Sequence, residues 1–209
     1  LRDLVRIAGS LGAAGVALNP LHAITLDDPG AISPYSPTSR LFLNPLYIDV
    51  DAVPEFPGVA AAGLAETVER LRATEQVDYA GVIPAKLAAL RLAYDAFVSG
   101  GSAERRADFD AFKVERGEWL TGFCAFSVLR ARHGGPWWAW PEEWRTPSRD
   151  KLAELARTDP SEMDFHAFVQ WNADRQLAAC AAAAADAGMP VGLYLDVAVG
   201  VAADSADVW

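Results

Sequence analysis

The chain has 209 residues, of which 52% are hydrophobic and 22% are charged, and its formal net charge is −10 at pH 7. This composition is typical of a globular chain that can bury a sizeable core. The acidic balance and the absence of a lysine or arginine cluster argue against nucleic acid or an anionic membrane surface as a partner.

The two ends of the chain share one pattern, a helix followed by a short apolar run. Residues 1–15 predict a helix that Gly12 or Gly15 can end. Its predicted core face consists of Leu4, Ile7, Ala8 and Leu11. The run VALNPLH (16–22) follows and is stopped by Pro20. Near the other end, a helix ending in DAG (186–188) leads into the run VGLYL, which ends at Asp196. Two such units predict an α/β fold with a parallel sheet or barrel.

Residues 33–50, SPYSPTSRLFLNPLYIDV, fit no regular element because three prolines interrupt them. They also carry several large apolar side chains, which a solvated linker would not hold. We therefore expect a long ordered loop packed against a scaffold, and such loops are usually functional.

The middle of the chain predicts helices. The first covers residues 64–73, the second contains a stripe from Ile83 to Phe97, and the third is bent at Gly117 or Gly122. The predicted stripe of the third helix consists of Phe109, Phe112, Trp119, Leu120, Phe123 and Phe126.

A final helix begins with Asp159 as its cap and Pro160 in its first turn. Its core face includes Phe165, Phe168 and Val169 and, unexpectedly, Asn172 and Gln176.

Histidines and carboxylates supply few candidate functional residues. His22 and Asp196 each follow a predicted strand, where α/β enzymes place their sites, but Asp196 can equally satisfy loop amides. His133 and His166 are interpreted as structural. The tryptophan-rich segment HGGPWWAWPEEW (133–144) could stack on sugars, and we favour a clamp that closes the helices onto the sheet. Spacing alone pairs no second acid with Asp196.

The cysteines and the termini bear on localisation. Cys124 and Cys180 lie in helix-like segments without metal-ligand spacing, and two thiols in such a chain suggest a reducing compartment. The amino terminus lacks the features of a signal peptide, and no apolar run is long enough to span a membrane. We expect a cytoplasmic protein without a bound metal.

The segments GVALNPLHA and SPYSPTSRLFLNPLYID together resemble the 4-α-glucanotransferases, or amylomaltases, of glycoside hydrolase family 77, in particular the larger bacterial branch. Four further segments follow in the family's order and spacing, so the resemblance covers nearly the whole chain. They are residues 77–97, 133–145, 164–177 and 191–209.

This resemblance implies the early strands of a (β/α)8 TIM barrel with a large helical insertion, in a chain that is itself mainly α. Residues 1–50 would hold an early barrel helix, a strand and the substrate loop. Residues 51–158 would form the insertion, and residues 159–209 a barrel helix and the strand ending at Asp196.

The resemblance also implies transfer of α-1,4-glucan segments between maltodextrins, with retention of configuration and no cofactor. Tyr35 matches the tyrosine that stacks on the sugar beside the scissile bond, and Asp196 matches an aspartate that contacts the same sugar. Ser33 and His22 complete the expected substrate-binding set.

No catalytic residue is expected among these residues, because the family's nucleophile, its acid/base glutamate and its H-D-N segment do not occur in them. We therefore expect an amino-terminal fragment of the catalytic domain that is inactive alone and prone to self-association through exposed strand edges. The alternatives are a non-catalytic helical module that binds glucan or joins subunits, and a hydrolase of the α-amylase clan.

Overall fold

Seven helices carry most of the chain, of which apolar periodicity predicts five; the helices over residues 142–145 and 149–158 were not expected. The computed structural model describes residues 1–209. The helices are α1 (Arg2–Ser10), α2 (Ala65–Arg72), α3 (Tyr79–Gly100), α4 (Ala103–His133), α5 (Glu142–Arg145), α6 (Arg149–Thr158) and α7 (Pro160–Asp186). The strands are β1 (Gly15–Leu18), β2 (His22–Ala23), β3 (Ser39–Leu43) and β4 (Gly192–Leu195). The expectation that the chain is mainly helical is confirmed.

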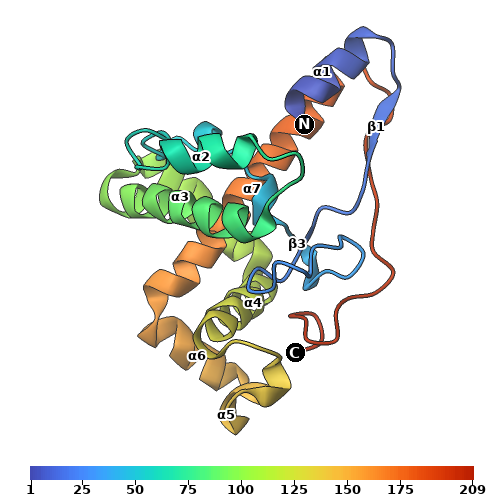
Figure 1. Ribbon diagram of the computed structural model, residues 1–209. Helices are drawn as coiled ribbons and strands as arrows, with labels where there is room; N and C mark the ends of the chain where they lie inside the picture. The colour runs from blue at the N-terminus through green and yellow to red at the C-terminus, as the bar shows by residue number, and fades with distance from the viewer.

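Helix α7 connects two parts of the molecule (Figure 1). Along its first half, Phe165, Phe168 and Trp171 belong to a core of 26 buried residues shared with α3, α4 and α6. At its far end, Ala183 and Ala184 pack in a small separate cluster with Val5 of α1. One helix therefore fixes the helical body relative to α1 and the strands beside it.

The strands form two small sheets. β1 and β4 pair in parallel, from Gly15 opposite Gly192 to Leu18 opposite Leu195, which confirms the predicted parallel pairing of the two helix–strand units. β2 and β3 pair antiparallel, with an irregularity between His22 and Ala23.

The predicted core face of α1 is wrong except at Ala8, which packs against the small cluster around Val5. Val5 is fully buried, whereas Leu4 and Ile7 are exposed and Leu11 is 81% exposed. The reason is that α1 packs mainly on α7 and β1, so that only a narrow stripe on one side of the helix is covered. Gly12 does end the helix, with a φ of 82° that suits glycine.

Helix α4 contains the predicted bend, and its position explains a second error. At Gly117 φ is 52° and ψ is −135°, far from helical values. The bend resets the phase of the helix, so that Phe112, Leu120 and Phe123 face the core while Trp119 is 74% exposed. The predicted stripe kept one phase on both sides of the bend and therefore placed Trp119 wrongly.

Helix α7 begins where predicted, at Pro160 after Asp159, but the capping bond is not made. Instead, the Asp159 carboxylate accepts hydrogen bonds from Arg132 (3.0 Å) and from the Thr158 hydroxyl (3.0 Å). The carboxylate thus ties the start of α7 to the end of α4.

The tryptophan-rich segment has the structural packing role that we favoured, but it packs against α4 and the chain after β4 rather than onto the strands. Trp140 is buried, with its ring 5.4 Å from that of Phe126 and 5.9 Å from that of Trp209. The Trp209 indole N–H donates to the Trp144 carbonyl at 2.8 Å. The segment therefore joins the end of α4 to the chain beyond β4.

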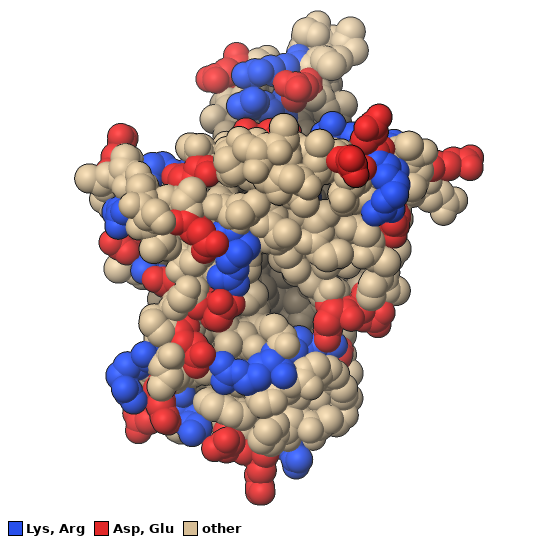
Figure 2. Space-filling view, turned by 60° about the vertical axis from the view of Figure 1, so that its left-hand side comes forward, with Lys and Arg blue, Asp and Glu red and all other residues tan.

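On the face shown in Figure 2, acidic and basic side chains are mixed and form no single basic patch. None of the helices combines the length and the apolar character that a bilayer span requires.

The bend in α4 supplies a stability test. Because only glycine adopts the backbone angles of Gly117 readily, we expect Gly117→Ala to lower the free energy of unfolding by about 1–3 kcal/mol. Gly122 lies in the same helix without a positive φ, and a side-chain carbon there meets no atom within 4 Å, so Gly122→Ala should stabilise by about 0.5–1 kcal/mol. Chemical denaturation measures both free energies of unfolding. If the two substitutions changed them equally, the backbone angles at Gly117 would not require glycine.

Candidate functional site

Polar side chains gather at the carboxyl ends of β1 and β4. Because Leu18 lies opposite Leu195 in the parallel pair, the next residues, Asn19 and Asp196, come out of the sheet side by side. The hydroxyl of Tyr35 lies between them: it donates to Asp196 Oδ2 at 3.1 Å and is 3.4 Å from Asn19 Oδ1. The structure therefore brings together two residues that the sequence singled out and one that it did not.

Asn19 was missed by the sequence reasoning. Its position could have identified it, because Asn19 directly follows the first strand just as Asp196 follows the last. Pro20 was interpreted only as the residue that ends the apolar run, and the polar side chain before it was not considered.

Tyr35 combines an accessible ring with an anchored hydroxyl. Its side chain is 52% exposed. The hydrogen bond to Asp196 is the main cause that raises the pKa of Tyr35 above its usual value, because the carboxylate would repel a phenolate. The residue is therefore a neutral hydrogen-bond donor with an aromatic surface open to a ligand.

Ser33 shapes the turn that presents Tyr35. Its hydroxyl accepts from the Tyr35 backbone N–H at 3.3 Å, and its carbonyl accepts from Ser36 N–H at 3.2 Å. The Ser33 side chain thus holds the backbone of Tyr35 and makes no hydrogen bond to Asp196 or His22.

His22 contacts the Asp196 segment from strand β2. Its Nε2 accepts from Ala198 N–H at 3.3 Å, which leaves the proton on Nδ1. Burial is the largest cause that lowers the pKa of His22, with Arg40 adding to it, while Asp207 and Asp196 oppose the shift. The imidazole is therefore neutral at pH 7 and offers one N–H donor.

The loop that carries Tyr35 is fastened on one side to the chain beyond β4. Ala202 N–H donates to the Pro37 carbonyl at 3.0 Å, and Arg40 N–H donates to Asp207 Oδ2 at 2.8 Å. The Arg40 guanidinium also reaches the Val199 carbonyl at 3.3 Å. Tyr35 and Asp196 are held together by these backbone contacts as well as by their own hydrogen bond.

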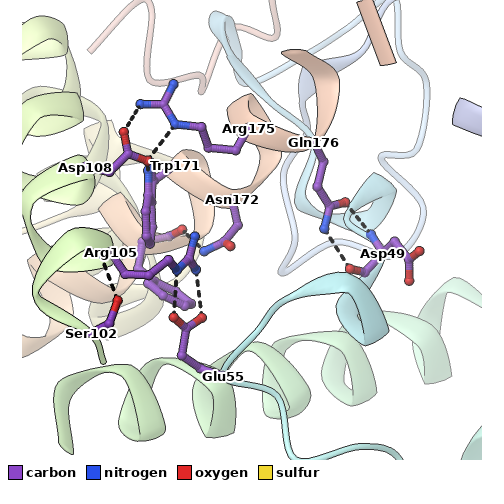
Figure 3. A network of polar contacts seen from close by, with 10 residues as sticks. Asp49, Glu55, Ser102, Arg105, Asp108, Trp171, Asn172, Arg175 and Gln176 are labelled. Atoms are coloured by element: carbon purple, nitrogen blue, oxygen red, sulfur yellow. Dashed lines mark hydrogen bonds and ion pairs between the residues drawn. The ribbon is translucent and has the colours of Figure 1, made fainter. Parts of the chain in front are cut away.

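Further along the chain, the same segment is fastened to helix α7. The side-chain amide of Gln170 makes two hydrogen bonds to the backbone of Leu43, both 2.9 Å. Gln176 binds Asp49 in the same way at 2.8 Å (Figure 3). The expected packing of this segment against a scaffold is therefore observed. The expectation that residues 33–50 fit no regular element is wrong, because residues 39–43 pair with β2 as strand β3 and residues 45–47 form a 3-10 turn.

The gathered groups suit binding of a neutral polar ligand. They comprise one carboxylate, one amide, a neutral imidazole and an aromatic ring that is open to solvent, and no second carboxyl group is hydrogen-bonded into the set. No cluster of three or more His, Cys, Asp or Glu side chains forms a metal site. The arrangement can orient hydroxyl groups and cover an apolar ring face.

Comparisons with known proteins show which family this chain resembles. A family model described as 4-alpha-glucanotransferase matches residues 1–209. Curated 4-alpha-glucanotransferases of Mycobacterium tuberculosis and Haemophilus influenzae are 36% and 33% identical to all of this chain. The chain spans only 30% and 33% of their respective lengths.

Two solved structures share the fold. An amylomaltase from Corynebacterium glutamicum superposes with a TM-score of 0.74 at 31% identity, over 98% of this chain and 28% of its own. An amylomaltase from Streptococcus agalactiae in complex with acarbose gives a TM-score of 0.77 at 20% identity, over 99% of this chain and 40% of its own. At that lower identity the likeness concerns the fold alone.

The state of His22 generates a pH prediction. A pKa below the usual 6.5 means that the unfolded chain binds the proton more readily, so stability should fall as the pH drops from 6.5 through the lower pKa of folded His22. The His22→Gln variant should lose less stability than wild type over that pH window. Burial also lowers the pKa of His166, to about 4, but its effect on stability is the same in both proteins. Denaturation from pH 7 to pH 4 measures the difference, and identical pH profiles would contradict the assignment.

Proposed function

The chain belongs to the 4-alpha-glucanotransferase family, and from this membership we propose that it forms part of an enzyme that transfers α-1,4-glucan segments between maltodextrins with retention of configuration. In this proposal the residues from 1 to 209 supply substrate-binding groups. Retaining transfer uses a pair of carboxyl groups about 5–5.5 Å apart, and we assign that pair to parts of the enzyme outside these residues. Asp196 hydrogen-bonds to the Tyr35 hydroxyl and to the Val197 backbone N–H, and to no second carboxyl group.

The contact between Tyr35 and Asp196 carries the proposal. The two residues are separated by 161 positions in the chain, yet their side chains lie 3.1 Å apart at the carboxyl ends of two parallel strands. Such strand ends are where barrel enzymes place substrate-binding and catalytic groups.

Each group has a distinct role in the proposed complex. The ring of Tyr35 would cover the apolar face of a glucose residue, and the Asp196 carboxylate would accept hydrogen bonds from its hydroxyls. His22 would donate from Nδ1. Ser33 would act through the backbone of Tyr35, which it holds, and no metal or organic cofactor is required.

We further propose that β1 and β4 are early strands of a (β/α)8 barrel. Residues 1–50 and 159–209 would be barrel segments, and residues 51–158 a helical insertion between them. The parallel pairing of β1 with β4 supports this proposal, because the two strands come from opposite ends of the sequence. Their outer edges and the exposed side chains of Tyr194 and Val199 would favour association when uncovered.

Substitution of Tyr35 tests the proposed role. We expect Tyr35→Ala to lower kcat/KM for disproportionation of maltotriose by about tenfold or more, equivalent to about 1.4 kcal/mol of lost stacking. Its effect on the free energy of unfolding should stay within about 0.5 kcal/mol, because the side chain is half exposed. Tyr35→Phe keeps the ring and loses only the hydrogen bond to Asp196, so its activity should lie in between.

The assay uses the protein as its gene encodes it, incubated with maltotriose, with free glucose and longer maltodextrins as products. Tyr47→Ala, at another exposed tyrosine, is the matched control and should retain transfer. Products without chains longer than maltotriose would indicate a hydrolase, and binding without any product would indicate a glucan-binding module. Equal losses of activity and stability in Tyr35→Ala would remove the stacking role.

A further inference from the structure

Helix α7 holds the backbone of β3 with a side chain. Gln170 is 3% exposed. Its Oε1 accepts from Leu43 N–H and its Nε2 donates to the Leu43 carbonyl, both at 2.9 Å. A side-chain amide presents an acceptor and a donor side by side, as the edge of a neighbouring strand does. Gln170 therefore pairs with Leu43 where β3 would otherwise need another strand.

A second glutamine repeats the contact further along α7. Gln176 pairs with both backbone groups of Asp49 at 2.8 Å (Figure 3). Both pairs are 127 positions apart in sequence, so the segment from 43 to 49 runs beside α7 in the same direction. Six helical residues rise about 9 Å, and the 3-10 turn η1 (Pro45–Tyr47) shortens the segment toward that length.

Leu43 is also linked to the candidate site. It lies opposite His22 in the pairing of β2 with β3. His22 in turn accepts from the backbone of Ala198, two residues beyond Asp196. A shift of Leu43 along α7 would therefore move His22 and the start of the loop that carries Tyr35.

We propose that Gln170 is a positioning residue for the glucan site, fixing β3 in the register at which His22 and Tyr35 meet the Asp196 segment. This inference rests on the proposed function of that site. Gln170 touches no substrate in the proposal and acts only through the Leu43 backbone. Gln176 secures the same segment at its far end.

Glutamine differs from the side chains of similar length in the hydrogen bonds that it can make to the Leu43 backbone. Methionine has a similar length but leaves the N–H and carbonyl of Leu43 unpaired. An ionised glutamate can accept from Leu43 N–H but faces the Leu43 carbonyl without a proton to donate. A protonated glutamate carries both an acceptor and a donor, so it reproduces the amide.

The surroundings of Gln170 give an introduced carboxylate no free positive partner. The charged and titratable side chains that line the same cavity come from α3, α4, α7 and the segment after β2: Arg91, Arg130, Glu162, His166 and Asp27. Arg91 is already paired with Glu162 at 2.6 Å, and Arg130 with Asp27 at 2.8 Å. Burial should therefore raise the pKa of a glutamate at 170 above its usual value of about 4.3.

The experiment compares Gln170→Met and Gln170→Glu with wild type in the protein as its gene encodes it. For Gln170→Met we expect a fall in kcat for maltotriose disproportionation of about 10- to 100-fold with a smaller change in KM, because displaced groups lose orientation. The activity of Gln170→Glu relative to wild type should rise as the pH falls and the carboxyl becomes protonated. Asn172→Leu is the matched control: its amide donates only to the Phe168 carbonyl within α7, so it should leave the Gln170 contact and kcat intact.

Hydrogen exchange gives a readout that does not depend on activity. In Gln170→Met the Leu43 amide should exchange at least about tenfold faster, since its buried N–H has lost its acceptor. Unchanged protection of Leu43, or a ratio of Gln170→Glu to wild-type activity that does not change with pH, would overturn the positioning role. A wild-type protein that makes no transfer products would instead refute the proposed function, while the exchange of Leu43 would still decide whether Gln170 holds β3.

Discussion

The long segment between β1 and α2 forms almost no sheet, so its backbone N–H and carbonyl groups need hydrogen-bond partners from elsewhere. The rest of the structure depends on how these partners are supplied. Between β1 and α2 the chain makes only the short strands β2 and β3 and two 3-10 turns. Buried N–H and carbonyl groups without partners would cost about 1–3 kcal/mol each. Helices α3 and α7 supply partners from side chains, including the Lys86 ammonium, which donates to the Ile48 carbonyl at 2.6 Å. The segment from Leu43 to Asp49 is therefore tied to the helices behind it by side-chain hydrogen bonds.

The far end of the same segment is held by charge rather than by amides. Arg105 binds the Glu55 carboxylate through two nitrogens, at 2.8 and 2.7 Å, and its guanidinium lies 4.0 Å from the centre of the Trp171 ring. Trp171 in turn donates to Asp108, which also pairs with Arg175 (Figure 3). A two-point hydrogen bond between a guanidinium and a carboxylate fixes the relative orientation of the two side chains and is also stronger than a single neutral hydrogen bond. Glu55, α4 and α7 are thus joined at one point.

The sequence was sufficient for the longer helices and for part of the site. Periodicity located α1, α2, α3, α4 and α7 but neither α5, α6 nor strand β3. The polar residue Gln176 on the core face of α7 marked the side that binds the loop. Trp119 was misplaced because a single glycine changes the phase of a helix, which no periodic pattern records. The meeting of Tyr35 with Asp196 was implied only by resemblance, because residues so far apart are brought together by packing of the whole chain. The same distance hid Asn19.

The position of the two parallel strands at opposite ends of the sequence has a consequence for the order of folding. Contacts among α3, α4 and α7 close shorter loops than the pairing of β1 with β4, and loop closure costs entropy that grows with length. We expect the helical body to form first and the strand pair to dock onto it last. The groups that surround Tyr35 would then assemble in the closing step, and a partly folded chain would have its helices but no binding site.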